Sequence, residues 1–188
     1  MRSPRMGCLG RMLWWRPWPA VVAVGCAMTA VSAEDLAFTT IPPEEYASFL
    51  ANWDEEQSAI FHGVLRTPQE YAAAFRPAVV MPNHKPCGPP PEFFTAGMLL
   101  VVARVIDAPA AGEQPLAVES LTAEGDEIIL RYRFMRPASP ATSTVKQPLV
   151  VRIASRPVDR VRFIENGRPV GDLHVAQGQW AVPQPPLD

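Results

Sequence analysis

Three histidines and three cysteines are the first residues of this sequence to consider for metal binding or nucleophilic chemistry. His84 and Cys87 have a spacing that could chelate a metal, but two ligands leave a tetrahedral site half filled. His62 and a carboxylate such as Asp54 could complete it only where the fold brings them together. A Cys87–His84 nucleophile pair lacks any mark of an oxyanion hole or of an orienting third group. We therefore expect no catalytic residue, no metal site and no cofactor. A metal-dependent or thiol hydrolase is the third of our hypotheses, after the two given at the end of this section.

Charge is distributed unevenly along the chain. Residues 129–168 hold nine basic and two acidic side chains, which is a net charge of +7. Because neighbouring strands lie about 4.8 Å apart, arginines of adjacent strands can form one basic face. Five arginines of this region alternate with apolar residues in three predicted strands and would form such a face if those strands are adjacent: Arg131, Arg133, Arg152, Arg160 and Arg162.

This basic face has two interpretations. In the first, it is solvated or is covered by the acidic first half of the same chain. In the second, it docks an acidic surface of a partner protein, because guanidinium groups are flat, forked donors that suit interfaces. We treat the five arginines as the candidate partner-binding face, and binding there should weaken as salt is raised.

The N-terminal segment, residues 1–33, has the three parts of a secretory signal. Four arginines lie in the first sixteen residues, an apolar run follows at 18–31, and Val31-Ser32-Ala33 offers small residues for cleavage. A helix over that run rises about 21 Å, which is short of the ~30 Å hydrocarbon core. We therefore expect export to the periplasm or the cell surface. Membrane contact is expected only through this segment or through a lipid on Cys26.

Removal of that segment changes the charge and the cysteine count. The whole chain carries 17 basic and 19 acidic residues, and loss of the four N-terminal arginines lowers its net charge from −2 to −6. A chain this acidic is not a general nucleic-acid binder. Cys87 would be the one cysteine left, which excludes a disulfide framework.

The segment at residues 97–106 is the strand around which the predicted fold is organised. It is an unbroken apolar run rich in β-branched residues, as expected for a strand buried on both faces. Three later segments are predicted to be its antiparallel partners. The alternation slips near Glu119 and Ser120, which predicts a β-bulge, and Glu165-Asn166-Gly167 predicts a hairpin turn. Further strands are predicted at residues 60–65, 116–122, 128–134, 149–153, 161–163 and 170–175.

Two short helices are predicted ahead of the strand at residues 97–106. Apolar residues at helical spacing predict an amphipathic helix over residues 42–53. Thr67-Pro68-Gln69-Glu70 is a capping box, and the helix that it begins should continue through Phe75 and stop at Pro77. Residues 82–91 hold five prolines and are predicted to form a loop.

Together these patterns predict a mainly β fold: a small antiparallel β-sandwich or partly closed sheet with one or two short N-terminal helices. The predicted organisation is a secretory signal at 1–33, a helical lead-in at 34–58, a β-rich domain at 59–176 and a proline-rich tail at 177–188. The hydrophobic side of the sheets is predicted to contain Leu99, Val101, Ile128, Leu130, Tyr132, Phe134, Leu149, Val151, Ile153, Val161 and Phe163.

From the central strand onward, the order of features is similar to that of the C-terminal domain of the PrcB type. That family is named for an accessory subunit of a bacterial surface protease complex. Upstream, Thr67 to Tyr71 resembles the short helix that often precedes this domain. The resembling residues are Phe94, Gly97-Met98-Leu99-Leu100-Val101-Val102, Leu116-Ala117-Val118, the strand at 128–134, Pro137, Lys146-Gln147-Pro148-Leu149-Val150-Val151 and Val161-Arg162-Phe163.

The resemblance covers residues 61–163 and departs from the family at one place. A Gly-Gly-aromatic element commonly follows the first long strand, whereas Ala110-Ala111-Gly112-Glu113-Gln114 stands here. The resemblance implies an exported, non-catalytic accessory domain that binds or stabilises another protein, such as an envelope protease. Our second hypothesis is a carrier for a small apolar or anionic ligand, held between the sheets or on the arginine face.

Overall fold

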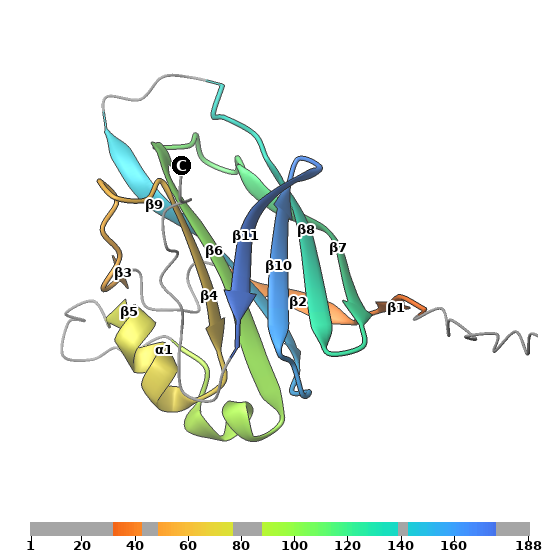
Figure 1. Cartoon of the computed structure of the whole chain (residues 1–188). Helices are drawn as coiled ribbons and strands as arrows, with labels where there is room; N and C mark the ends of the chain where they lie inside the picture. Colours follow the sequence, from red (N-terminus) through yellow and green to blue (C-terminus); the bar gives the residue numbers. More distant parts are fainter. Residues whose placement is uncertain (1–31, 43–48, 77–87, 139–142, 176–188) are drawn as a thin grey trace, which may run out of the picture. The chain divides into compact units, whose positions relative to one another are not determined.

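The computed structural model describes residues 32–42, 49–76, 88–138 and 143–175, which form two β-sheets and a separate two-stranded ladder (Figure 1). The prediction of a mainly β chain is confirmed, and most of the strand pairs are antiparallel. Both sheets contribute to one cluster of buried side chains, which is consistent with a sandwich. No helix in the described residues is long and apolar enough to cross a membrane.

The five-stranded sheet has the strand order β1-β7-β8-β10-β11. Its pairs are antiparallel except for β8 with β10, which run parallel. The β7–β8 pairing shifts between Val118 and Ser120, which confirms the predicted bulge. Asn166 and Gly167 have positive φ and make the predicted turn between β10 and β11. The strands are β1 (Glu34–Asp35), β7 (Leu116–Glu124), β8 (Glu127–Phe134), β10 (Arg160–Glu165) and β11 (Arg168–His174).

The four-stranded sheet has the order β2-β9-β6-β4. Its strands are β2 (Phe38–Ile41), β9 (Thr144–Ala154), β6 (Gly97–Asp107) and β4 (Ile60–Leu65). The predicted central strand is confirmed as β6, which pairs with β9 on one side and β4 on the other. Among the described strands that follow β6, only β9 is its neighbour, so the prediction of three later antiparallel partners is wrong. The others belong to the opposite sheet and share the core with β6, because an apolar side can be buried across a core as well as beside a strand.

Strand β6 is buried on both faces because it serves two cores. Met98, Leu100 and Val102 lie in the core between the sheets. Leu99 and Val101 lie in a second core on the outer side of the four-stranded sheet. The prediction that these two residues share one side with the rest is therefore wrong, although they are fully buried. The second core also contains Leu50, Trp53, Phe61, Leu65, Ala74, Phe75, Phe94, Ala103 and Val150.

The predicted helical lead-in is wrong wherever it is described. Residues 34–41 contain β1 and β2, and β3 (Phe49–Leu50) pairs with β5 (Phe75–Arg76). Asn52 has a φ of 58°, which ends any helix there. Trp53 is buried because it packs on Phe61 of β4. Residues 43–48, the rest of the predicted helix, lie outside the described residues.

The capping box does begin a helix, α1 (Pro68–Ala74). The Thr67 hydroxyl accepts a hydrogen bond from the Glu70 backbone N–H at 3.1 Å. The Glu70 carboxylate in turn accepts the backbone N–H of Arg66, one residue before the usual capping-box position. The helix ends at Ala74, one residue before the predicted end, because Phe75 enters β5. A 3₁₀-helix, η2 (Pro91–Thr95), leads into β6.

Candidate functional site

The five arginines of the candidate partner-binding face lie on two different sheets. Arg131 and Arg133 are on β8, which pairs with the strand of Arg160 and Arg162, β10. Arg152 is on β9, which belongs to the four-stranded sheet. The condition for a single basic face is therefore not met, and the prediction of one face is wrong. Alternation assigns each side chain to a face of its strand, but it does not determine which strands are neighbours.

Two of these arginines are paired with acids of their own sheet. Arg160 donates hydrogen bonds to Asp172 of β11, and Arg162 Nη2 lies 2.9 Å from Glu127 Oε1 of β8. The hydrogen bond from Arg160 holds the pKa of Asp172 below its ordinary value. Glu127 and Asp172 stand just outside residues 129–168, so the charge of +7 counted for that region omits both. The sheet itself therefore neutralises part of the face.

Other cations of the same region contact acids from the first half of the chain. Lys146 Nζ lies 2.8 Å from Glu55 Oε2, and Arg156 Nη1 lies 3.3 Å from Glu34 Oε2. Among the described residues, Arg131 and Arg133 form no ion pair, and both are exposed. The candidate face on the five-stranded sheet is thus reduced to these two arginines.

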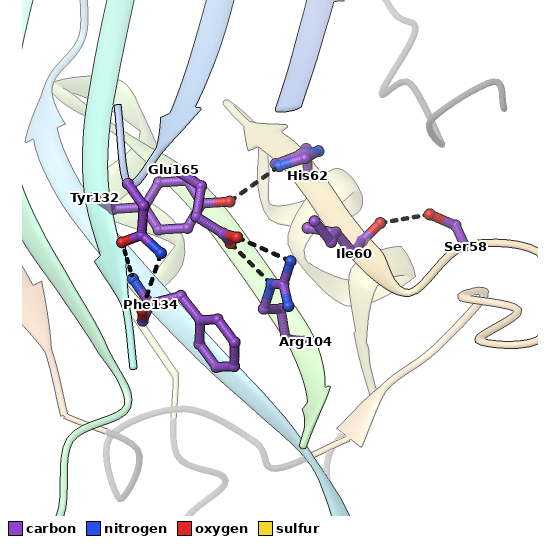
Figure 2. Close-up of polar contacts among 8 residues, drawn as sticks. Ser58, Ile60, His62, Arg104, Tyr132, Phe134 and Glu165 are labelled. Atoms are coloured by element: carbon purple, nitrogen blue, oxygen red, sulfur yellow. Dashed lines mark hydrogen bonds and ion pairs between the residues drawn. The ribbon is translucent and has the colours of Figure 1, made fainter. Parts of the chain in front are cut away.

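A buried polar cluster lies between the two sheets (Figure 2). Its members are His62 of β4, Arg104 of β6, Tyr132 of β8 and Glu165 of β10. Arg104 donates two hydrogen bonds to Glu165, with Nε–Oε2 at 2.8 Å and Nη2–Oε1 at 2.9 Å. The Tyr132 hydroxyl oxygen lies 3.5 Å from His62 Nε2, a long contact. We call these four residues the inter-sheet polar cluster.

His62 is the histidine of this cluster and is only 1% exposed. Its ring packs on Phe163, with 4.5 Å between ring centroids. Gly171 of β11 permits this position, because a Cβ there would lie 2.5 Å from His62 Nδ1. Burial, followed by the positive charge of Arg104, lowers the pKa of His62 to about 4. The ring is therefore uncharged at neutral pH.

Tyr132 is held in its protonated form. Burial raises the pKa of its hydroxyl far above the ordinary value, and the negative charge of Glu165 raises it further. With His62 and Tyr132 uncharged and Arg104 paired with Glu165, the cluster is neutral as a whole. A neutral, buried network of this kind ties the two sheets together and offers no exposed nucleophile.

The residues considered for metal binding or nucleophilic chemistry do not meet in the described structure. His84 and Cys87 lie outside the described residues. Asp54 is exposed and accepts a hydrogen bond from the backbone N–H of Glu56, whereas His62 is buried between the sheets. In the part of the chain that the structure describes, no group of three or more His, Cys, Asp or Glu side chains could hold a metal ion.

Strand β2 lies between two surface grooves. It is at the edge of the four-stranded sheet, and its strand neighbour within the described residues is β9 alone. An outer groove of about 820 Å³ is lined by β2, η2 and β9, and it includes Phe93 and Arg152. An inner groove of about 590 Å³ is lined by β2, β9 and the start of β7, and it includes Leu116 and Leu149. We call β2 with its two grooves the β2 edge site.

Two side chains distinguish the β2 edge site. Phe38 is 40% exposed and lines both grooves. The Arg152 guanidinium carbon lies 4.5 Å from the centroid of the Phe93 ring, and Arg152 forms no ion pair with a described residue. Neither groove is lined by a member of the inter-sheet polar cluster. The open surface and the buried network are therefore separate features.

The β2 edge site was not predicted from the sequence, because residues 34–58 were assigned to a helical lead-in. A signal was nevertheless present. Phe38-Thr39-Thr40-Ile41 is an uncharged run of aromatic and β-branched residues, which favours a strand, and Pro42 ends it. The inter-sheet polar cluster had no such signal, because its members are separated by up to 103 positions in the chain, from His62 to Glu165.

Comparisons with known proteins found no match to this chain among protein-family models, curated proteins or solved structures. The resemblance of residues 61–163 to the PrcB-type domain therefore stays a prediction.

Proposed function

We propose that this chain is an exported, non-catalytic accessory domain that binds another protein, such as an envelope protease. The observation that carries the proposal is the β2 edge site. An exposed aromatic side chain, Phe38, borders two open grooves beside a strand with one neighbour among the described residues. Open grooves beside a strand edge suit a polypeptide, whereas small-molecule sites are usually concave enough to bury most of the ligand.

The inter-sheet polar cluster supports a structural use of its residues. Its histidine has the low pKa that an active site can also produce, but burial is the main cause here. His62 is 1% exposed and is covered by Phe163. A substrate would have to separate the two sheets to reach it.

The two exposed arginines of β8 are a second candidate contact area. Of the five arginines predicted to dock an acidic partner, Arg131 and Arg133 still form an exposed basic area on one sheet. Because both side chains are exposed, their contribution should fall as ionic strength rises and the Debye length shortens from about 10 Å at 0.1 M salt. Their contribution can thus be separated from that of the β2 edge site.

A carrier of a small anionic ligand is the second candidate function. The outer groove favours it, because it combines a volume of about 820 Å³ with the Arg152 guanidinium beside Phe93. A carrier with its ligand between the sheets has less support, because buried apolar side chains fill that space.

The proposal is tested with the full chain expressed in a host that exports it, collected from the exported fraction as bait. Intact mass reports cleavage near Ala33 and any lipid on Cys26. The bait is mixed with envelope extract, and bound proteins are quantified against the bait. We expect one protein at near-stoichiometric amount. Absence of any such protein, together with a co-purifying small molecule in native mass spectra, would replace the proposal by the carrier function.

A further inference from the structure

We infer that the β2 edge binds an extended segment of a partner protein as an added strand, with a carboxylate of that segment on Arg152. This inference rests on the proposed protein-binding function, and it names the site and the chemistry of the partner. In strand addition, main-chain hydrogen bonds supply affinity, and grooves for alternate side chains supply specificity. The β2 edge site offers both.

The register of β2 sets which of its side chains belongs to which face. Phe38 and Thr40 pair with Ile153 and Val151, whose side chains lie in the core between the sheets. Thr39 pairs with Arg152, on the opposite face. Because side chains alternate along a strand, a strand added beside β2 would direct every second side chain toward each groove.

The inner groove places apolar side chains beside the β2 edge. Gln114 and Gln147 line it as well, and its accessible apolar side chains include Val118 and the exposed ring of Phe38. Its acidic residue, Glu113, already accepts hydrogen bonds from the backbone N–H groups of Ala110 and Ala138. The inward positions of the added segment that meet Phe38 and Val118 should therefore be aliphatic or aromatic.

The outer groove selects for a carboxylate. Arg152 stacks on Phe93 in the same way that Arg104 stacks on Phe134, with guanidinium-to-centroid distances of 4.5 and 4.3 Å. Arg104 has Glu165 as its partner, whereas Arg152 has no carboxylate partner among the described residues. The acid of this groove, Glu92, is exposed and forms no ion pair with a described residue, so it does not neutralise Arg152 by contact. A partner carboxylate would pair with Arg152 as Glu165 pairs with Arg104, beside the ring on which the guanidinium stacks.

The edge itself is open to pairing. β2 has four residues, none of them charged and none of them proline. Such an edge lacks the charges, prolines and bulges with which proteins block strand addition. Its short length is itself one of those devices, so an added segment can pair over a few residues only. A second copy of the chain could pair there as well, and the test below separates the two.

The probe is a phage-displayed library of random heptapeptides, selected on the immobilised exported chain. We expect selected peptides to alternate apolar residues with Asp or Glu and to carry no central proline. Phe38→Lys, which places a charge on the inner side of the edge, should weaken selected peptides at least tenfold. Arg152→Gln should weaken only the acidic peptides, by about fivefold, as expected for a partly exposed ion pair.

Matched controls are available outside the β2 edge site. Met135→Lys makes the same change at the second large exposed apolar side chain of the described residues, which follows β8, is 46% exposed and lines neither groove. Arg168→Gln makes the same change at an exposed arginine of β11 that lines neither groove and belongs to neither candidate contact area. Both should leave binding unchanged, and circular dichroism melts should confirm that all four variants are folded.

Three outcomes would overturn the inference. The first is a selection that yields no enriched peptide, and the second is peptides that bind Phe38→Lys and Met135→Lys equally. The third is a concentration-dependent dimer, seen by light scattering, that Phe38→Lys abolishes, because a second copy would then be the occupant. If the envelope extract yields a stoichiometric partner that Phe38→Lys still binds, the protein-binding function stands and only this site fails.

Discussion

The four-stranded sheet contains two arginines that stack on phenylalanine rings in different surroundings. Arg104 of β6 lies over Phe134, its side chain is 22% exposed, and Glu165 binds it through two hydrogen bonds. Arg152 of β9 lies over Phe93 and is exposed, without a carboxylate partner in the described part of the chain. The fold supplies a carboxylate to Arg104, and we propose that another molecule supplies one to Arg152.

The reason for the difference is the position of each arginine relative to the second sheet. Arg104 points toward the five-stranded sheet, where the parallel β8–β10 register brings Glu165 beside Tyr132. Arg152 points away from that sheet, toward η2. A buried guanidinium without a partner would cost several kcal/mol, so the interior has to supply the carboxylate. An exposed guanidinium remains hydrated and imposes no such requirement.

The largest effect is expected from Phe163→Ala, which removes the ring beneath His62. Phe163 is fully buried in the core between the sheets, so the loss should be about 3–5 kcal/mol of unfolding free energy. Phe93→Ala at the β2 edge site is the matched change, and it should cost about 1 kcal/mol because that ring is only half-buried. Urea unfolding measures both. Equal losses would contradict the division into a buried and an open region.

The next effect concerns pH. Folded His62 has a pKa of about 4, against 6.5 for the ordinary side chain, so the unfolded state binds more protons between these values. Stability should therefore fall by about 3 kcal/mol as pH decreases from 6.5 to 4, at about 1.36 kcal/mol per pKa unit. The measurement is urea unfolding at several pH values for the wild type and for His62→Gln. The difference between the two curves should change across this window, and parallel curves would contradict the buried, neutral histidine.

Glu165→Gln should have a smaller effect, of about 2–3 kcal/mol. The change leaves Arg104 largely buried without its counter-charge, but the 22% exposure of that side chain allows some hydration. Asp172→Asn is the control, because it breaks an exposed pair on the outer side of the five-stranded sheet and should cost less. Thermal unfolding of both variants compares the two losses of stability. A larger loss for Asp172→Asn than for Glu165→Gln would contradict the expectation that the Arg104–Glu165 pair stabilises the fold more than the exposed pair does.

Arg152→Gln should have the smallest effect on folding, about 0.5 kcal/mol or less. The side chain is exposed, and among the described residues it stacks on one aromatic ring, that of Phe93. The same change should weaken acidic peptides by about fivefold, so stability and binding separate at this position. A loss above about 2 kcal/mol in urea unfolding would mean that Arg152 is satisfied within the fold, and the comparison with Arg104 would fail.

Much of the fold was predictable from local patterns. The alternation in β8, the turn at Asn166-Gly167 and the capping box at Thr67 each depend on a few neighbouring residues, and all three predictions are confirmed. The helix predicted over residues 42–53 failed because helical spacing of apolar residues also arises when a strand and a loop bury them separately, as Leu50 and Trp53 do here. Periodicity in a short segment does not distinguish the two.

The candidate sites were less predictable than the elements that carry them. Arg131 and Arg152 were both correctly expected to face away from the inter-sheet core, but they lie on different sheets. The acids that neutralise Arg160 and Arg162 were not recognised, because the β8–β10–β11 register determines their position. Glu165 was likewise not recognised as the partner of Arg104, because the sequence predicts only that it belongs to a turn.

By itself, the sequence determined properties that depend on near neighbours: the approximate positions of β4 and of β6 to β11, the alternation of side chains along β8, the cap of α1 and the β10–β11 turn. The tertiary structure alone decided which strands are neighbours, which sheet β9 joins, and which arginine meets a carboxylate. The physical reason is that alternation follows from the backbone geometry of one strand. Strand order depends instead on burying several apolar faces together, and those faces come from segments far apart in the chain.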